Sequence, residues 1–185
     1  MKVPIDPRAL ALSRLPRKAV GIEIGVHQGR FSRQILRVAN PKTLYLIDPW
    51  MSVGDGPQTV SHYGSKHADQ EKMDERYETL LKSFGPKIEE GQVVIVRKRS
   101  LDAVDMFEDG SVDFVYIDGD HDYAAVKADI DAYLPKVKKG GLLIGDDYVD
   151  GYWWGRGVIE AFHEALAKYP VEIDFKVGEQ IAIRV

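Results

Sequence analysis

The 185-residue chain contains no cysteine. This absence excludes disulfide bonds, thiolate metal sites and cysteine nucleophiles. Long hydrophobic runs are missing as well, and the opening residues 1–18 are interrupted by Pro4, Pro7 and Pro16. A signal peptide or a membrane-spanning helix needs a continuous apolar stretch. We therefore predict an irregular N-terminal segment at 1–18 and a cytoplasmic protein with no membrane partner.

Positive charge is not in excess. The chain carries 25 lysine and arginine residues against 29 aspartate and glutamate residues, for a net charge of -4. Nucleic-acid binding depends on clustered lysine and arginine, so no nucleic-acid partner is expected. With 44% hydrophobic residues and this length, the chain can bury one core. We predict a single domain over 1–185, and the sequence leaves open whether it forms a homo-oligomer.

Short apolar runs alternate with amphipathic stretches along the chain. The runs predict strands at 19–24, 43–48, 93–96, 112–118, 142–144, 171–177 and 180–185. Helical spacing predicts helices around 31–38, 73–84, 101–107, 126–137 and 158–166. The fourth of these helices is expected to end at Gly140-Gly141. Parallel strands need crossover connections, so the alternation predicts an α/β fold with a doubly wound, mostly parallel, seven-stranded sheet.

Two segments depart from this alternation of strands and helices. Only Gly178-Glu179 separates the last two strands, which predicts a C-terminal antiparallel hairpin. The polar segment 51–70 contains Gly54, Gly56, Pro57 and Gly64 and is too long for a plain connection. Long loops in compact domains are usually functional or disordered, so we predict a mobile lid.

A glycine turn follows the first strand, with the pattern Glu23-x-Gly25-x-x-x-Gly29. Small residues there let backbone amides approach a ligand closely. The spacing differs from Gly-x-Gly-x-x-Gly, and the carboxylate of Glu23 would repel a pyrophosphate but attract an ammonium group. The turn therefore favours an amino-acid-bearing cofactor over a dinucleotide. His27 lies in the turn, either against the cofactor or as a surface histidine.

Asp48 ends the second strand, 25 positions beyond Glu23. An acidic residue at this place can accept hydrogen bonds from both hydroxyls of a ribose. The alternative is a turn aspartate before Pro49. The strand–turn–helix context shared with Glu23 favours the ribose interpretation.

Acidic residues gather where two later strands end, in Asp118-Gly119-Asp120-His121 and in Asp146-Asp147. Like charges so close need a cation, and carboxylate oxygens select a hard ion such as Mg²⁺. A hydroxyl bound to such an ion loses its proton more readily, and His121 can accept that proton. Asp120 is more simply explained as the cap of a helix beginning at His121.

These motifs resemble a known family. The segments 21–29, 44–48, 113–123 and 140–148, in this order and with a terminal hairpin, resemble class I S-adenosylmethionine-dependent methyltransferases, which have a Rossmann-like fold. Within that class they are most similar to the metal-dependent O-methyltransferases of the macrocin and mycinamicin sugar type. Catechol O-methyltransferase is a more distant match. The resemblance covers nearly the whole chain from Ala19.

The resemblance implies a role for each matching residue. Glu23 and Gly25 would hold the methionine part of the cofactor, Asp48 its ribose, and Ser100 with Leu101 its adenine. We also predict cofactor contacts at His27, Gly29 and Asp118. The metal ligands would be Asp118, Asp146 and Asp147, with His121 as the base and Asp118 also catalytic. The acceptor would be a small molecule. Two departures weaken the inference of its identity: the chain lacks the long N-terminal portion of those relatives, and the catechol type has Asp-Asn at Asp146-Asp147.

Aromatic residues near the same edge, Trp50, Tyr148, Trp153 and Trp154, are expected to form a wall against the acceptor, with core packing as the alternative. The charge run Arg97-Lys98-Arg99 is expected to be solvated. Two other functions remain: an NAD-dependent oxidoreductase, disfavoured by the missing glycine fingerprint, and a catalytically silent cofactor-binding module.

Overall fold

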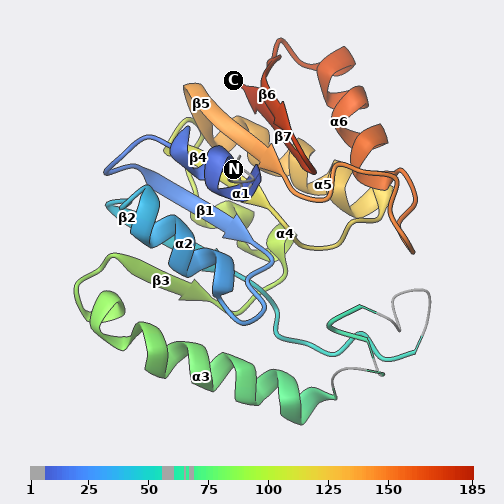
Figure 1. Cartoon of the computed structure of the whole chain (residues 1–185). Coiled ribbons are helices and arrows are strands. Elements are labelled where there is room, and N and C mark those ends of the chain that lie inside the picture. Colours follow the sequence, from blue (N-terminus) through green and yellow to red (C-terminus); the bar gives the residue numbers. More distant parts are fainter. Residues whose placement is uncertain (1–6, 56–60, 65, 67–68) are drawn as a thin grey trace, which may run out of the picture.

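A seven-stranded sheet forms the centre of the computed structural model, which describes residues 7–55, 61–64, 66 and 69–185. Its strand order is β3-β2-β1-β4-β5-β7-β6 (Figure 1). The strands are β1 (Val20–Ile24), β2 (Thr43–Ile47), β3 (Val93–Val96), β4 (Val112–Ile117), β5 (Val137–Gly145), β6 (Glu172–Val177) and β7 (Gln180–Arg184). The pairings among β1 to β5 are parallel, whereas β7 runs antiparallel to both β5 and β6. The predicted fold class, including the C-terminal hairpin, is confirmed.

Helices cover both faces of the sheet because the strand side chains alternate between two buried clusters. In β4, Phe114 and Tyr116 point into one cluster and Val115 and Ile117 into the other. The first cluster also receives side chains of α1 (Pro7–Ser13), α2 (Arg30–Val38) and α3 (Gln70–Glu89). The second receives side chains of α4 (Ser100–Ala103), α5 (Tyr123–Tyr133) and α6 (Gly157–Lys168). Short 3₁₀ turns, Val104–Met106 and Leu134–Lys136, extend α4 and α5.

The N-terminal segment departs from the prediction of an irregular 1–18. Residues Pro7–Ser13 form the helix α1, in which Ala11 and Leu12 are buried. Proline is compatible with the first position of a helix, where its missing N–H has no intrahelical partner to lose. Pro7 therefore begins a short helix here, and Pro16 lies beyond its end.

The predicted lid at 51–70 lies partly outside the described residues. Its described part contains no regular strand, and an isolated bridge joins Gly54 to Gly64. The helix α3 begins at Gln70 and is capped by the Asp69 carboxylate, which accepts a hydrogen bond from the Lys72 N–H. The mobility of this segment stays a prediction.

The predicted helix end at Gly140-Gly141 is wrong. The helix α5 ends at Tyr133, next to the turn that contains Pro135, and β5 already begins at Val137. Proline ends a helix because it cannot donate a backbone hydrogen bond. Gly140 instead gives β5 a residue with a φ of 81°, where the register against β4 shifts.

The predicted cap of α5 was also misplaced by two residues. The helix begins at Tyr123, and the carboxylate of Asp122 accepts a hydrogen bond from the Ala124 N–H at 2.9 Å. Asp120 accepts one from the Asp122 N–H at 3.1 Å and so shapes the turn before the helix. Asp120 is therefore not the helix cap.

In the described part of the chain, no helix is long and apolar enough to cross a membrane.

The cap of α5 can be tested by substitution. We expect Asp122→Ala to lower the free energy of unfolding by about 1 kcal/mol, because the Ala124 N–H loses its acceptor. Asp122→Asn is the control, since its side-chain oxygen can still accept the bond. Urea unfolding followed by circular dichroism measures both, and an equal loss in the two variants would contradict the assignment.

Candidate active site

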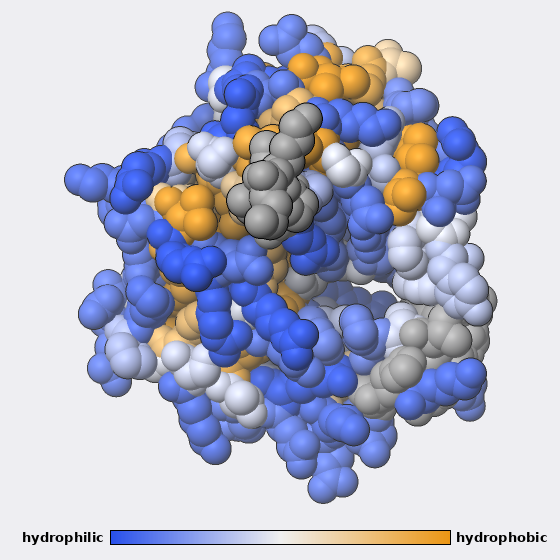
Figure 2. All heavy atoms as spheres, viewed as in Figure 1, coloured by the Kyte–Doolittle hydropathy of each residue, from blue (hydrophilic) through white to orange (hydrophobic). Residues whose placement is uncertain are grey.

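The carboxyl ends of the central parallel strands meet at one edge of the sheet. The Asp118 N–H donates to the Ile24 carbonyl at 2.8 Å, and the Gly25 N–H donates to the Ile47 carbonyl at 3.0 Å. The strand order reverses between β1 and β4, and ligands of such sheets bind at this switch point. Figure 2 shows the molecule hollowed beyond this edge, on a face that is mainly hydrophilic. The predicted residues gathered at this edge are Glu23, Asp48, Asp118, Asp146 and Asp147.

Glu23 is a buried acid on β1. Its residue is 1% exposed, and neither carboxylate oxygen has a hydrogen bond of normal geometry among the described residues. Burial raises the pKa of Glu23 well above its usual range, the nearby Ser32 hydroxyl opposes this rise, and the charge of Asp118 adds to it. A buried carboxyl group without a partner is costly, so this position suits a ligand that brings a cation or donors.

The glycine turn after β1 approaches the end of β4 closely. Gly25 has a φ of 86°, and a Cβ atom at this position would lie 2.0 Å from the Asp118 carbonyl oxygen. Only glycine combines this backbone conformation with such an approach. Gly29 precedes α2 with a φ of 66°, and its missing Cβ leaves room for the Leu80 side chain.

His27 in this turn is partly buried and is not a plain surface histidine. Its ring stacks on His62 at a centroid distance of 4.8 Å, and Nε2 has no hydrogen-bond partner among the described residues. Burial, helped by the charge of Arg76, lowers the pKa of His27 to about 4. The imidazole is therefore neutral at neutral pH.

Asp48 connects the end of β2 to the glycine turn. Its Oδ2 accepts hydrogen bonds from the Val26 and His27 N–H groups, each at 2.9 Å, and its Oδ1 accepts one from the Trp50 N–H at 2.7 Å. The Tyr63 hydroxyl also donates to Oδ2. A ribose hydroxyl bound at Oδ2 would take the place of the Tyr63 hydroxyl.

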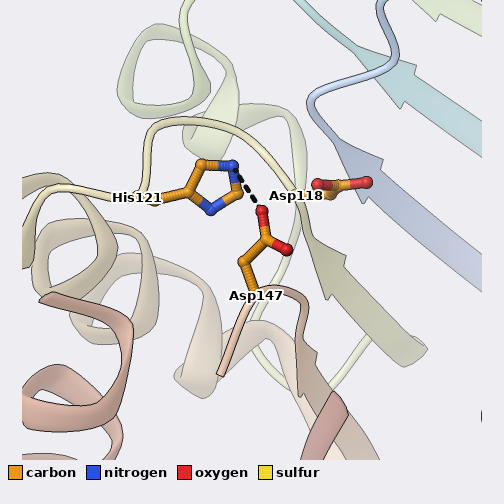
Figure 3. A group of neighbouring side chains, drawn as sticks. All are labelled: Asp118, His121 and Asp147. Atoms are coloured by element: carbon orange, nitrogen blue, oxygen red, sulfur yellow. Dashed lines mark ion pairs between the residues drawn. The ribbon is translucent and has the colours of Figure 1, made fainter. Parts of the chain in front are cut away.

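Three side chains lie together beyond β4 and β5, namely Asp118, His121 and Asp147 (Figure 3). Each offers one ligand atom, and these atoms lie within 4.8 Å of one another. His121 Nε2 lies 3.4 Å from Asp147 Oδ2. Such a group of two carboxylates and one imidazole can hold a divalent cation. We call these residues the acidic group.

Asp146 has other partners. Its side chain is 1% exposed and accepts hydrogen bonds from the Gln180 amide and the Arg8 guanidinium. The same Arg8 nitrogen lies 3.6 Å from Asp118 Oδ2, so the guanidinium stands between two carboxylates. The sequence-based set of metal ligands thus differs from the set that lies together here, which contains His121 in place of Asp146.

Arg8 and Gln180 are the residues that the sequence analysis missed. Gln180 is a buried polar residue at the start of the apolar run Ile181-Ala182-Ile183, a position that is unusual for an amide. The Tyr116 hydroxyl bonds its side-chain oxygen, which turns the NH₂ group toward Asp146. No local sequence pattern identifies Arg8 as a residue of the site.

Burial changes the proton affinity of the acidic group. It raises the pKa of Asp118 to about 7, Arg8 opposes this rise, and the charge of Asp147 adds to it. Burial lowers the pKa of His121 below its usual value, although Asp147 and Asp120 oppose the change. His121 is therefore a neutral imidazole near pH 7 and can accept a proton.

Two of the four aromatic residues expected to face an acceptor lie beside His121. The ring centroids of Trp154 and Trp153 are 5.1 Å and 6.2 Å from the imidazole. Trp50 is fully buried and donates its indole N–H to the His27 carbonyl, while Tyr148 is 8% exposed and bonds His163. For these two residues, core packing was the correct interpretation.

The charge run after β3 was also expected to be solvated, yet Arg97 is engaged. Its guanidinium donates to the Trp50 carbonyl at 3.2 Å, pairs with Asp74 and lies over the Tyr77 ring.

The two residues predicted to contact an adenine lie at the start of α4. Ser100 is its first residue, and Leu101 exposes half of its surface.

A comparison of the whole chain with known families decides its class. A family model described as a methyltransferase domain matches residues 22–148, more than half of the chain. The chain belongs to this methyltransferase family. The match begins within β1 and includes Glu23, Asp48 and the acidic group.

Individual relatives are more distant. A stretch of 56 residues is 41% identical to an uncharacterized protein, R132, of Acanthamoeba polyphaga mimivirus, covering 30% of this chain and only 25% of that protein. The O-methyltransferase of Bacillus cereus, solved with SAH, is 14% identical with a TM-score of 0.65, over 100% of this chain and 83% of that one. TomG of Streptomyces achromogenes, an O-methyltransferase solved with SAM, is 18% identical with a TM-score of 0.64, over 99% and 81%. At these identities the two structures show a shared fold.

The close approach at Gly25 leads to a stability prediction. We expect Gly25→Ala to lower the free energy of unfolding by about 1–3 kcal/mol more than Gly155→Ala, because its Cβ meets a backbone carbonyl. Gly155 is the matched control, since it shares a positive φ but a Cβ added there would have no contact within 4 Å. Equal losses in urea unfolding would show that the turn after β1 can move away from β4.

Proposed function

We propose that this methyltransferase binds S-adenosylmethionine and transfers its methyl group to a hydroxyl oxygen of a small molecule, with His121 as the base. The observation that carries this proposal is the buried, unpaired carboxylate of Glu23 beside the glycine turn. An ammonium group of the cofactor would supply the missing positive charge. The pyrophosphate of a nicotinamide dinucleotide would add a second negative charge there.

The expected cofactor contacts follow the strand order. Glu23 on β1 and Gly25 after it would bind the methionine part, Asp48 after β2 the ribose, and Ser100 with Leu101 after β3 the adenine. The order β1-β2-β3 of neighbouring strands in the sheet supports contacts in this sequence along one edge. The O-methyltransferases of similar fold that were solved with SAH and with SAM support this choice of cofactor.

Methyl transfer is an in-line displacement, in which the acceptor oxygen forms a bond to the methyl carbon and the bond from that carbon to sulfur breaks. The protein must align the two partners and accept the proton of the hydroxyl. His121, neutral because of its burial, would take this proton on a free ring nitrogen, and Asp147 would stabilise the resulting imidazolium. Trp153 and Trp154 would pack against the acceptor and exclude water.

The acidic group suits a divalent cation in its donor chemistry. Asp118 and Asp147 would hold a hard ion such as Mg²⁺, which lowers the pKa of a hydroxyl bound to it. His121 would act as the base in this arrangement. If His121 were itself a ligand, the donor set would suit a transition metal better than Mg²⁺.

One observation favours a second candidate, a catalytically silent cofactor-binding module. The Arg8 guanidinium already places a positive charge between Asp118 and Asp146. A protein whose acidic residues are neutralised internally needs no metal there. The experiments below separate the two candidates.

The role of Glu23 predicts a large effect on cofactor binding. We expect Glu23→Gln to weaken the binding of S-adenosylhomocysteine about 10- to 100-fold, the range for a charged hydrogen bond. An ammonium group favours the ionised form of Glu23, whose pKa burial has raised, so binding should release a proton from the wild type. Titration calorimetry in two buffers of different ionisation enthalpy measures both quantities. Glu78→Gln, on the exposed side of α3, is the control, and unchanged proton release in Glu23→Gln would refute the assignment.

The catalytic proposal is tested on a panel of hydroxyl acceptors with labelled S-adenosylmethionine and Mg²⁺. On an acceptor that is turned over, we expect His121→Gln to lower kcat about 10²- to 10⁴-fold, the usual contribution of a general base. Asp118→Asn and a chelator should also abolish turnover, whereas His163→Gln should not.

Three results would count against parts of this scheme. Turnover that survives both Asp118→Asn and the chelator would exclude a metal role, and turnover that survives His121→Gln would exclude the base. Tight cofactor binding without turnover of any acceptor would favour the silent module.

A further inference from the structure

A buried carboxylate that has no part in the proposed function lies on α5. Asp129 is 5% exposed and faces inward with its buried neighbours Val126 and Ile130. Its Oδ1 accepts a hydrogen bond from the Ser100 hydroxyl at 2.5 Å. Burial raises the pKa of Asp129 to about 6, and the bond from Ser100 opposes this rise. The carboxyl group is thus kept out of water and directed at one residue of α4.

Ser100 receives a second bond from the same helix. The hydroxyl of Tyr133, which is fully buried, donates to the Ser100 carbonyl at 2.7 Å. Asp129 and Tyr133 are four positions apart on α5 and therefore lie on one side of it. Together they hold both the side chain and the backbone of the first residue of α4.

The helix α4 needs such support. It has only four residues, and its N-cap, Arg99, provides no side-chain hydrogen bond. A helix of this length is unstable by itself, so its direction depends on tertiary contacts. It also presents an apolar side chain to solvent, because Leu101 is 50% exposed.

The place of α4 relates it to the proposed cofactor site. The strand β3, which precedes it, is joined to the end of β2 by a bond from the Asp48 N–H to the Val96 carbonyl at 3.2 Å. The helix α4 thus begins four positions after Val96, the last residue of the strand next to the proposed ribose-binding residue.

We propose that Asp129 is a positioning residue for the base of the cofactor. Through Ser100 it fixes the start of α4, so that Leu101 presents its exposed apolar side chain to a planar purine. Asp129 itself does not touch the ligand. This inference rests on the proposed cofactor, but it is independent of the acceptor, the metal and His121.

The test compares two ligands that differ by the base. S-adenosylhomocysteine carries the adenine, whereas S-ribosylhomocysteine keeps the ribose and the amino acid and lacks it. We expect Asp129→Ala and Ser100→Ala each to weaken the binding of S-adenosylhomocysteine about 3- to 10-fold in titration calorimetry, the effect of one hydrogen bond. Binding of S-ribosylhomocysteine should not change.

Matched variants isolate the Asp129–Ser100 bond. Asp129→Asn keeps an acceptor oxygen and should retain most of the affinity, and the double variant Asp129→Ala/Ser100→Ala should bind no more weakly than either single variant. Asp131→Ala is the control, because this carboxylate lies on the same helix but pairs with Lys127 and Lys168.

Four outcomes would overturn the proposal. Equal weakening of both ligands would indicate a general loosening of the fold, and unchanged affinity for both would show that α4 needs no support from Asp129. If the wild type binds the two ligands equally well, the base is not recognised and only this inference fails. If it binds neither ligand, the proposed cofactor fails as well.

Discussion

The carboxylate of Asp48 is the interaction on which the geometry of the site depends. It accepts the Val26 and His27 N–H groups on one oxygen and the Trp50 N–H on the other. These bonds close the turn after β1 against the end of β2, while the backbone of Gly25 lies against the end of β4. The carboxyl ends of β1, β2 and β4 are therefore fixed relative to one another. Glu23, Asp48 and Asp118 lie at these ends, on the same edge of the sheet.

Charge balance divides this space into two parts. Around β4 and β5, Arg8 reaches both Asp118 and Asp146, so that part has an internal cation. Around β1, Glu23 has a raised pKa and no hydrogen bond of normal geometry among the described residues. The second part can gain more from a positively charged ligand than the first, because the charge of Arg8 only weakly opposes the raised pKa of Glu23. This difference supports the proposed cofactor more strongly than the proposed metal.

Local patterns in the sequence predicted the strands and the edge at which they meet. An apolar run such as Val112-Asp113-Phe114-Val115-Tyr116-Ile117 predicts a buried strand from local sequence alone. The parallel topology then brings Glu23, Asp48 and Asp118 to one edge of the sheet. What the sequence did not reveal are contacts between distant residues. Arg8 meets Asp146 over 138 positions, and the burial of Trp50 depends on its fit against Tyr77 and its bond to His27. Such contacts leave no periodic signal.

The contact of Arg8 constrains how a metal can enter the acidic group. Asp146 is 1% exposed and already bonded by Gln180 and Arg8, so it can join a metal only if the guanidinium withdraws. Arg8 also lies 3.6 Å from Asp118, but the ligand atoms of Asp118, His121 and Asp147 already lie within 4.8 Å of one another. If a metal bound there with Arg8 in place and took His121 as its third ligand, the proposed base would be lost. The proposed role of His121 therefore requires either that Arg8 moves away from Asp146 or that Asp118 and Asp147 hold the metal as its two protein ligands.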